Sequence, residues 1–258
     1  MTKQEMMNLL IEDTIINMSR IEEESLKAEK ENRIPKIVHY CYLGWRYIKD
    51  GYLQRIAHWH EVLGKDWIFV NWTPLIKPIE SEFERWLFDN NKRAFYADVV
   101  RAKQVTRYGG VYMDCDVELH KDLTPLLDKD YVFCKEINQP YMDGGVFLAK
   151  KNNIFLKTIS QRYDRTTPEE YQRNPKRFLL GEAWKRALID AGKRFIYDNI
   201  PDFETYDRLL ERKDQNNAFC IDTKWFCNPV RYYQKAMWWM KPNPDAWTTH
   251  LFTNSWNF

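Results

Sequence analysis

The chain has 258 residues, of which 44% are apolar and 29% are charged, so it can form one large domain with a sizeable core. Its net charge of +2 offers no general attraction for nucleic acid. The five cysteines include no CxxC pair, which argues against zinc and a disulfide framework and favours reduced thiols in a cytoplasmic protein. We expect neither a membrane span nor a signal peptide, because no apolar run approaches roughly 18 residues and the N-terminus has no apolar core.

Residues 1–33 differ in composition from the rest and are expected to form a helical appendage. Apolar side chains recur in this segment at helical spacing: Met7, Ile11, Ile15 and Met18. Such a helix can pack on the main domain or on a partner. Its mixed polar face is unlike the Lys- and Arg-rich face of membrane-surface helices, although peripheral association with the inner face of the cell membrane stays an alternative. Residues 34–258 are expected to form the main domain, and the sequence does not determine an oligomeric state.

Strands and helices are expected to alternate in the first half of the main domain. The apolar runs IPKIVHYCYLG at 34–44 and DWIFVNW at 66–72 are typical of buried strands. Helical patterns follow them at 52–63 and 80–90. This β-α-β-α order predicts an α/β fold with a mostly parallel central sheet flanked by helices.

Three ring-bearing side chains lie at or just beyond the end of the first strand: His39, Tyr42 and Trp45. Ligands of open α/β sheets bind outside the carboxyl ends of the strands, so this end is a candidate binding edge. Tyr42 is either a surface on which a base stacks or an aromatic residue of the core.

A helix is expected at 92–108, and Gly109-Gly110 marks its end. Asp98 and Arg101 are three residues apart and share one face of this helix. Taken alone, such a pair is most simply a surface ion pair.

A short apolar strand at 111–113 runs directly into Asp114 and Asp116. On an extended segment, two carboxylates at this spacing point the same way. They would repel one another unless a cation lies nearby, and Mg²⁺ or Mn²⁺ with oxygen ligands is often shared with substrate phosphates. The pair following a buried strand and a Gly-Gly turn is therefore a candidate metal site.

Two later segments complete the candidate site residues. Asp143-Gly144-Gly145 is expected to be a turn before another strand, and its glycines would let backbone approach a ligand closely. A helical pattern at 178–191 carries Glu182 near its start.

Three blocks of this sequence resemble glycosyltransferase family 32: IPKIVHYCYLG, then YADVVRAKQVTRYGGVYMDCDVEL, then a C-terminal His-x4-Ser-Trp. That family includes bacterial capsule and lipopolysaccharide sugar transferases and the yeast initiating mannosyltransferase. A more distant similarity is to the glucosylating domain of the large clostridial toxins. The resemblance is strong over residues 34–126 and 250–256 and loose between 152 and 245. It implies a GT-A type nucleotide-sugar-binding fold and a retaining, metal-dependent hexosyltransferase.

The resemblance also implies roles for individual residues. Tyr42 matches the position near the nucleotide base, and Asp98 and Arg101 match residues that contact the ribose and sugar of the donor. Asp116 matches the direct metal ligand. Asp114 matches a residue that reaches the ribose and sugar, with metal contact through water.

At the C-terminus, the resemblance makes His250 the candidate that completes the metal site. Ser255 and Trp256 match the closing Ser-Trp that covers the donor phosphates and shuts out water. Many relatives read His-His-x-x-Gly-Ser-Trp here, whereas this chain has Leu251 and Asn254 at the second His and the Gly.

Contacts to the sugar or acceptor are matched to Asp143, Gly144 and Glu182. Relatives commonly carry Gly-Pro before the late helix, where this chain has Gly181-Glu182, so acceptor binding is expected to differ.

The reaction implied is transfer of a hexose from a nucleotide-sugar donor, with a UDP-sugar favoured and GDP-mannose the alternative. A glycan or lipid-linked glycan would be the acceptor, in bacterial surface polysaccharide synthesis. A nitrogen ligand beside carboxylates favours Mn²⁺ over Mg²⁺. Two other classes stay open. Asp-x-Asp at a strand end also serves metal-dependent phosphohydrolases and nucleotidyltransferases, and a sugar-binding module without catalysis would bind a donor and not turn it over.

Overall fold

The computed structural model describes residues 2–14, 18–43, 50–74, 76–135, 142–175, 218–221 and 246–251. The described helices are α1 (Lys3–Thr14), α2 (Met18–Lys30), α3 (Asp50–Leu63), α4 (Glu82–Asp89), α5 (Arg93–Tyr108), η1 (Thr124–Leu126), α6 (Ile154–Arg165) and α7 (Pro168–Arg173). The described strands are β1 (Ile37–Tyr40), β2 (Ile68–Asn71), β3 (Gly110–Met113), β4 (Val117–Leu119), β5 (Tyr131–Lys135), β6 (Met142–Ala149), β7 (Ala218–Ile221) and β8 (Thr248–His250). Of these helices, none is long and apolar enough to cross a bilayer.

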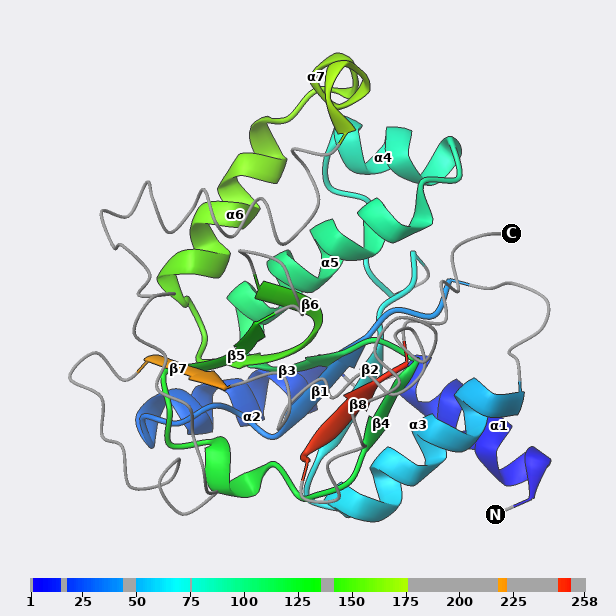
Figure 1. The fold of residues 1–258 in the computed structure, drawn as a ribbon, viewed down its shortest axis with the longest axis vertical. Coiled ribbons are helices and arrows are strands. Elements are labelled where there is room, and N and C mark those ends of the chain that lie inside the picture. Colours follow the sequence, from blue (N-terminus) through cyan, green and yellow to red (C-terminus); the bar gives the residue numbers. More distant parts are fainter. Residues whose placement is uncertain are drawn as a thin grey trace, which may run out of the picture.

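The central sheet has the strand order β2-β1-β3-β6-β5-β7, and a separate ribbon pairs β4 with β8 (Figure 1). The predicted α/β class is confirmed, and β2, β1 and β3 run parallel as expected. The sheet is mixed, because β6 runs antiparallel to both β3 and β5. The connection between β5 and β6 spans only residues 136–141, which is too short for the crossover of a dozen or more residues that a parallel pair requires.

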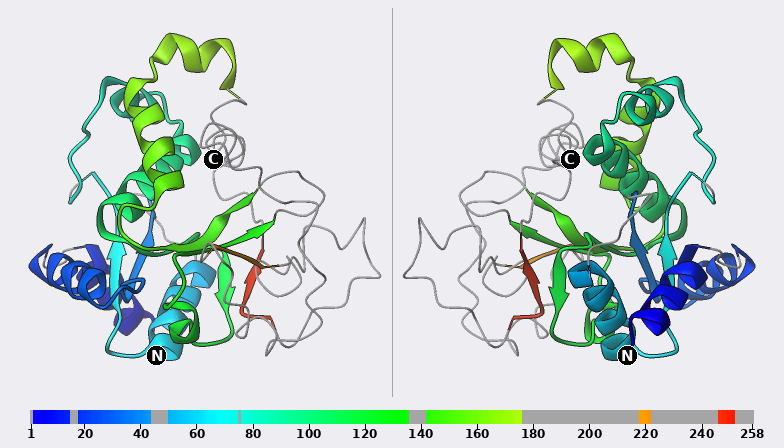
Figure 2. Two further views of the ribbon diagram at one scale, coloured as in Figure 1. Left: turned by 90° about the vertical axis from the view of Figure 1, so that its left-hand side faces the viewer. Right: turned by 90° about the vertical axis from the view of Figure 1, so that its right-hand side faces the viewer.

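The sheet is apolar on both faces, and this explains the unbroken apolar runs of its strands. Ile37 and Val38 on β1 belong to two different hydrophobic clusters, because successive side chains of a strand point to opposite faces. One cluster includes residues of α5 and α6, and the other includes residues of α3. Figure 2 shows α5 and α6 on one side of the sheet and α3 on the other.

The N-terminal segment forms two helices, where the sequence suggested a single helical stretch. Asp13 of α1 is buried, accepts a hydrogen bond from the Tyr40 hydroxyl at 2.6 Å and lies 3.2 Å from Nε2 of His60. In α2, the Ser25 hydroxyl donates to the carbonyl of Tyr108 at 2.7 Å. Both helices therefore pack on the main domain, while the boundary at residue 33 stays a prediction.

The Gly109-Gly110 turn connects α5 to β3 and lets β3 pack closely on β1. Both residues have positive φ, of 72° and 118°, which glycine adopts without strain. A Cβ on Gly110 would lie 2.5 Å from the carbonyl oxygen of Ile37 and 2.8 Å from Nε2 of His39. No larger residue fits here, so the prediction that α5 ends at this Gly-Gly pair is confirmed with a packing reason.

His39 is buried beneath the Gly109-Gly110 turn and makes a hydrogen bond to it. It is therefore not exposed at the end of β1, where the sequence suggested a candidate binding edge. It is fully buried, its Nε2 lies 2.7 Å from the carbonyl oxygen of Gly109, and its Nδ1 accepts a hydrogen bond from Nε1 of Trp72 at 2.8 Å. These partners require the neutral ring with its proton on Nε2. Burial lowers the pKa of His39 to about 4, against the hydrogen bond to Gly109, which raises it.

We expect His39→Gln to weaken the acid sensitivity of folding. Because the pKa of His39 is lower in the folded state, its stabilising effect is present above about pH 6.5 and is lost as pH falls towards 4. Over this window the wild type should lose about 3 kcal/mol more than the variant. Urea unfolding followed by tryptophan fluorescence at several pH values measures the difference. His58→Gln, at an exposed histidine, is the control, and parallel pH profiles for wild type and His39→Gln would contradict the expectation.

Candidate metal and substrate site

The Asp114-Cys115-Asp116 segment forms a turn between β3 and β4. The Asp114 amide donates to the carbonyl of Gly145 at 2.7 Å, and the Asp114 carbonyl accepts from the Val117 amide at 2.9 Å. The prediction of an extended segment here is wrong, because this second bond closes a four-residue turn. The two carboxylates nevertheless converge on one point.

The β4–β8 ribbon brings His250 to this turn. His250 lies opposite Val117 in the antiparallel register, and the Leu251 amide donates to the Asp116 carbonyl at 3.1 Å. At the other end of the ribbon, His120 donates its amide to the carbonyl of Trp247 at 2.8 Å. Figure 1 shows β8 alongside β4, although the two strands are far apart in the sequence.

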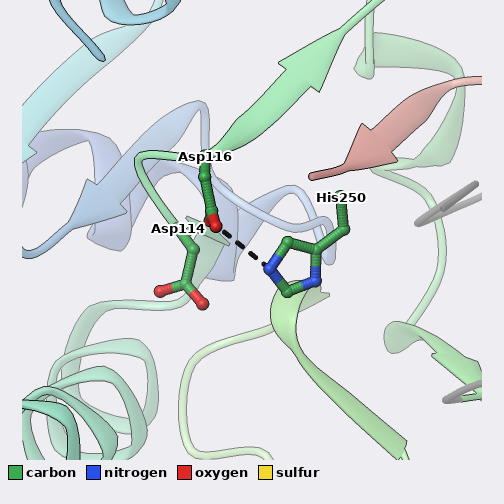
Figure 3. A group of neighbouring side chains, drawn as sticks. All are labelled: Asp114, Asp116 and His250. Carbon is green, nitrogen blue, oxygen red and sulfur yellow. Dashed lines mark ion pairs between the residues drawn. The ribbon is translucent and has the colours of Figure 1, made fainter. Parts of the chain in front are cut away.

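Asp114, Asp116 and His250 form a group that fits a divalent cation. One potential ligand atom from each lies within 4.8 Å of the others, and Nε2 of His250 lies 3.4 Å from Oδ1 of Asp116. Figure 3 shows the two carboxylates and the imidazole facing a common centre. Two oxygens and one nitrogen suit Mn²⁺ better than Mg²⁺, which prefers oxygen ligands alone. These are the three residues predicted to hold the metal, and their role as ligands stays a prediction.

Arg101 reaches the site from α5 and holds Asp114. Its NH2 group lies 3.2 Å from both Oδ1 of Asp98 and Oδ1 of Asp114, and its NH1 group donates to the Gly144 carbonyl. The guanidinium lies 4.4 Å from the ring centroid of Tyr112, whose hydroxyl donates to Asp114 at 2.8 Å. Arg101 is only 4% exposed, so the Asp98–Arg101 pair is not the bland surface ion pair that its spacing alone suggested.

The Asp143-Gly144-Gly145 segment lies within β6. The sequence-based prediction of a turn before the strand is therefore wrong. Asp143 is buried, and its carboxylate accepts from the Gly145 amide through Oδ1. Its Oδ2 lies 3.2 Å from Nδ1 of His250. A Cβ on Gly145 would lie 2.4 Å from Cε1 of His250, so glycine is required for the imidazole to lie over this strand.

The site carries more negative than positive charge among the described residues. Burial raises the pKa of Asp114; Arg101 lowers it and Asp116 raises it further. Burial alone would lower the pKa of His250, but Asp143 and Asp116 on either side of the ring raise it well above its usual value. A divalent cation would supply the positive charge that these carboxylates lack.

The other predicted site residues divide into those near this centre and those outside the described chain. Tyr42 is half-buried, and the adjacent carbonyl of Cys41 lies 3.7 Å from the Cys115 thiol, so the end of β1 lies beside the metal turn. Glu182, Ser255 and Trp256 lie outside the described residues, and their roles stay predictions.

Sequence reasoning did not identify three features of the site: the Tyr112 hydroxyl on Asp114, the Asp143–His250 contact and the steric role of Gly145. The sequence did contain one signal for the Asp143–His250 contact. Asp143 lies next to an apolar run, where burial is expected, and a buried carboxylate needs a partner because leaving it unpaired is costly. The sequence does not say which partner it takes.

We expect Gly145→Ala to displace the His250 ring and weaken metal binding. The added Cβ would overlap the imidazole, so Mn²⁺ affinity should fall roughly 10-fold and stability by about 1–3 kcal/mol. Isothermal titration with Mn²⁺ and thermal unfolding measure the two effects. Gly51→Ala, where a Cβ would only touch the Arg55 guanidinium at 3.6 Å, should leave Mn²⁺ affinity unchanged. Wild-type affinity in Gly145→Ala would exclude His250 from the metal site.

The chain is similar to a known protein family and to several solved structures. Residues 11–133 match the family model described as "Glycosyltransferase sugar-binding region containing DXD motif". No curated protein matches the chain significantly. Among solved structures, the chain is similar to the PaToxG glycosyltransferase, with 14% identity over 67% of this chain and 80% of that chain and a TM-score of 0.49.

Two further solved structures are similar over a larger share of the chain. One is a glycosyltransferase involved in glycosylation of the major capsid of PBCV-1, with 13% identity over 84% of this chain and 93% of that chain and a TM-score of 0.43. The other is mouse xyloside xylosyltransferase 1, with 10% identity over 84% of this chain and 85% of that chain and a TM-score of 0.38. The Asp114-Cys115-Asp116 segment lies within the residues matched by the family model, so the chain is similar to that family over the part that carries the DXD motif.

Proposed function

We propose that this chain is a retaining, Mn²⁺-dependent glycosyltransferase of the GT-A type that transfers a hexose from a UDP-sugar to a glycan acceptor. The observation that carries the proposal is the convergence of Asp114, Asp116 and His250 from two different strand ends. Within a DXD sugar-binding region, such a group would hold the cation that binds the diphosphate of the donor. When bound, the cation would act as a Lewis acid that neutralises charge on the departing nucleoside diphosphate.

The chain's own residues would bind and orient the donor around that centre. Asp116 and His250 provide metal ligands, while Asp114 is held by Arg101 and Tyr112 in a fixed orientation. Such fixed groups lower the barrier by positioning, because they lose little freedom when the donor binds. Asp98 and Arg101 would contact the ribose and sugar, and Tyr42 at the end of β1 would stack on the base. Ser255 and Trp256 would cover the phosphates and exclude water.

Retention and the identity of the substrates rest on the resemblance to glycosyltransferase family 32. In a retaining transfer of this kind we expect no separate carboxylate to act as general base, and the leaving phosphate would take the acceptor proton. The acceptor would be a glycan or lipid-linked glycan of a bacterial capsule or lipopolysaccharide, contacted near Gly144 and Glu182. GDP-mannose is the alternative donor.

We expect Asp116→Ala to abolish Mn²⁺-dependent turnover of the donor while the protein stays folded. Asp116 supplies one of the two carboxylates in the described group, so its loss would leave only Asp114 and His250 for the cation. The backbone bond from the Leu251 amide to the carbonyl of residue 116 is kept in the variant. Release of nucleoside diphosphate measures turnover, and circular dichroism checks folding. Glu118→Ala, two residues away on β4 and partly exposed, is the matched control and should retain activity. Normal turnover in Asp116→Ala would exclude the metal role.

A donor screen in the presence of Mn²⁺ identifies the reaction class and the donor together. Incubation with UDP- and GDP-hexoses should release intact nucleoside diphosphate, fastest with a UDP-sugar. A phosphohydrolase would instead release inorganic phosphate, and a nucleotidyltransferase would release pyrophosphate. Binding of a donor without any release would indicate a sugar-binding module. Preference for GDP-mannose would keep the glycosyltransferase and replace the favoured donor.

A further inference from the structure

The imidazole of His250 lies between two carboxylates that approach it from opposite sides. Nδ1 lies 3.2 Å from Oδ2 of Asp143, and Nε2 lies 3.4 Å from Oδ1 of Asp116. Only Asp116 belongs to the group of potential ligand atoms together with Asp114, so Asp143 lies behind the ring. Asp143 is therefore placed to position the proposed metal ligand His250 and not to bind the metal itself.

We propose that Asp143 is a positioning residue that fixes the orientation and tautomer of His250, so that Nε2 points towards Asp114 and Asp116 and can bind the cation. The inference rests on the proposed metal-dependent function and goes beyond it, because it assigns Asp143 to His250 and not to the sugar or acceptor.

Both oxygens of Asp143 are already engaged inside the protein. Oδ1 accepts from the amide of Gly145, which fixes the carboxylate against its own strand, and Oδ2 faces His250. Asp143 is 3% exposed, so little of it is open to a substrate hydroxyl. A carboxylate in this position accepts a hydrogen bond from Nδ1–H, and the lone pair of the neutral ring then lies on Nε2, on the metal side.

Gly145 completes the arrangement. With no side chain, it leaves room for the ring of His250 directly over β6, next to the carboxylate that holds it. Asp143 and Gly145 lie two residues apart on β6, so both face the same side of the strand. Asp143 supplies the hydrogen-bond acceptor for the ring, and Gly145 supplies the space for it. Gly145 thus leaves the space that the ring occupies, and Asp143 sets the orientation of the ring.

The test is a double-mutant cycle on Mn²⁺ affinity, read from the EPR signal of free Mn²⁺. Asp143→Asn keeps the volume and an acceptor for the Gly145 amide, but its amide group can donate to Nδ1 and so favours a proton on Nε2, where it blocks the metal. We expect Mn²⁺ affinity to fall roughly 10-fold in the wild-type background. In the His250→Ala background the same substitution should change affinity less than about 2-fold, because its effect is transmitted through the missing ring.

A matched control is Asp13→Asn, which also changes a buried carboxylate next to a histidine, His60, but lies on α1. It should leave Mn²⁺ affinity unchanged. If Asp143→Asn does not fold, as judged by circular dichroism, Asp143→Ser gives the same comparison with a smaller side chain.

The outcomes separate this inference from the proposed function. An equal loss of affinity from Asp143→Asn in both backgrounds would show that Asp143 acts without His250 and would overturn the inference alone. Unchanged affinity in Asp143→Asn would overturn it as well. Failure of the wild-type protein to bind Mn²⁺ would instead overturn the proposed metal-dependent function, and the inference with it.

Discussion

Carboxylates buried side by side repel one another unless positive charge lies among them, and this constraint shapes the whole site. Asp98, Asp114, Asp116 and Asp143 come from a helix, a turn and a strand, and they meet around Arg101 and His250. The guanidinium compensates Asp98 and Asp114, and the imidazole compensates Asp116 and Asp143 only when it is protonated. The remaining excess of negative charge gives a physical reason for a divalent cation in this position.

Two glycines allow the charged side chains of the site to lie this close together. Gly110 allows β3 to approach β1 and His39, which sets the start of the strand that leads to Asp114. Gly145 allows His250 to lie over β6, which sets the other side of the same centre. The positions of the charged groups thus depend on close backbone packing as much as on the strands that carry them.

The local sequence pattern was sufficient to predict the strands and helices of the first half of the chain. Continuous apolar runs indicated strands buried on both faces, and the Gly-Gly pair indicated the end of α5, because both signals depend only on neighbouring residues. The antiparallel direction of β6 was not predicted, since it depends on pairing with strands distant in the sequence. The turn at Asp114-Cys115-Asp116 was not predicted because the pair was interpreted as a continuation of the strand before it, although the bond that closes the turn is local. Arg101 looked like half of a surface ion pair because spacing on a helix carries no information on burial.

The sequence by itself determined the α/β class, the Asp-x-Asp pair after a buried strand, and the family resemblance that selected His250 as its companion. Tertiary structure decided how these residues act together. The β4–β8 register places His250 opposite Val117 and next to Asp116, and β6 places Asp143 behind the imidazole. Such contacts join positions more than a hundred residues apart, and they are set by strand pairing and available volume, neither of which is encoded in the spacing of residues along one segment.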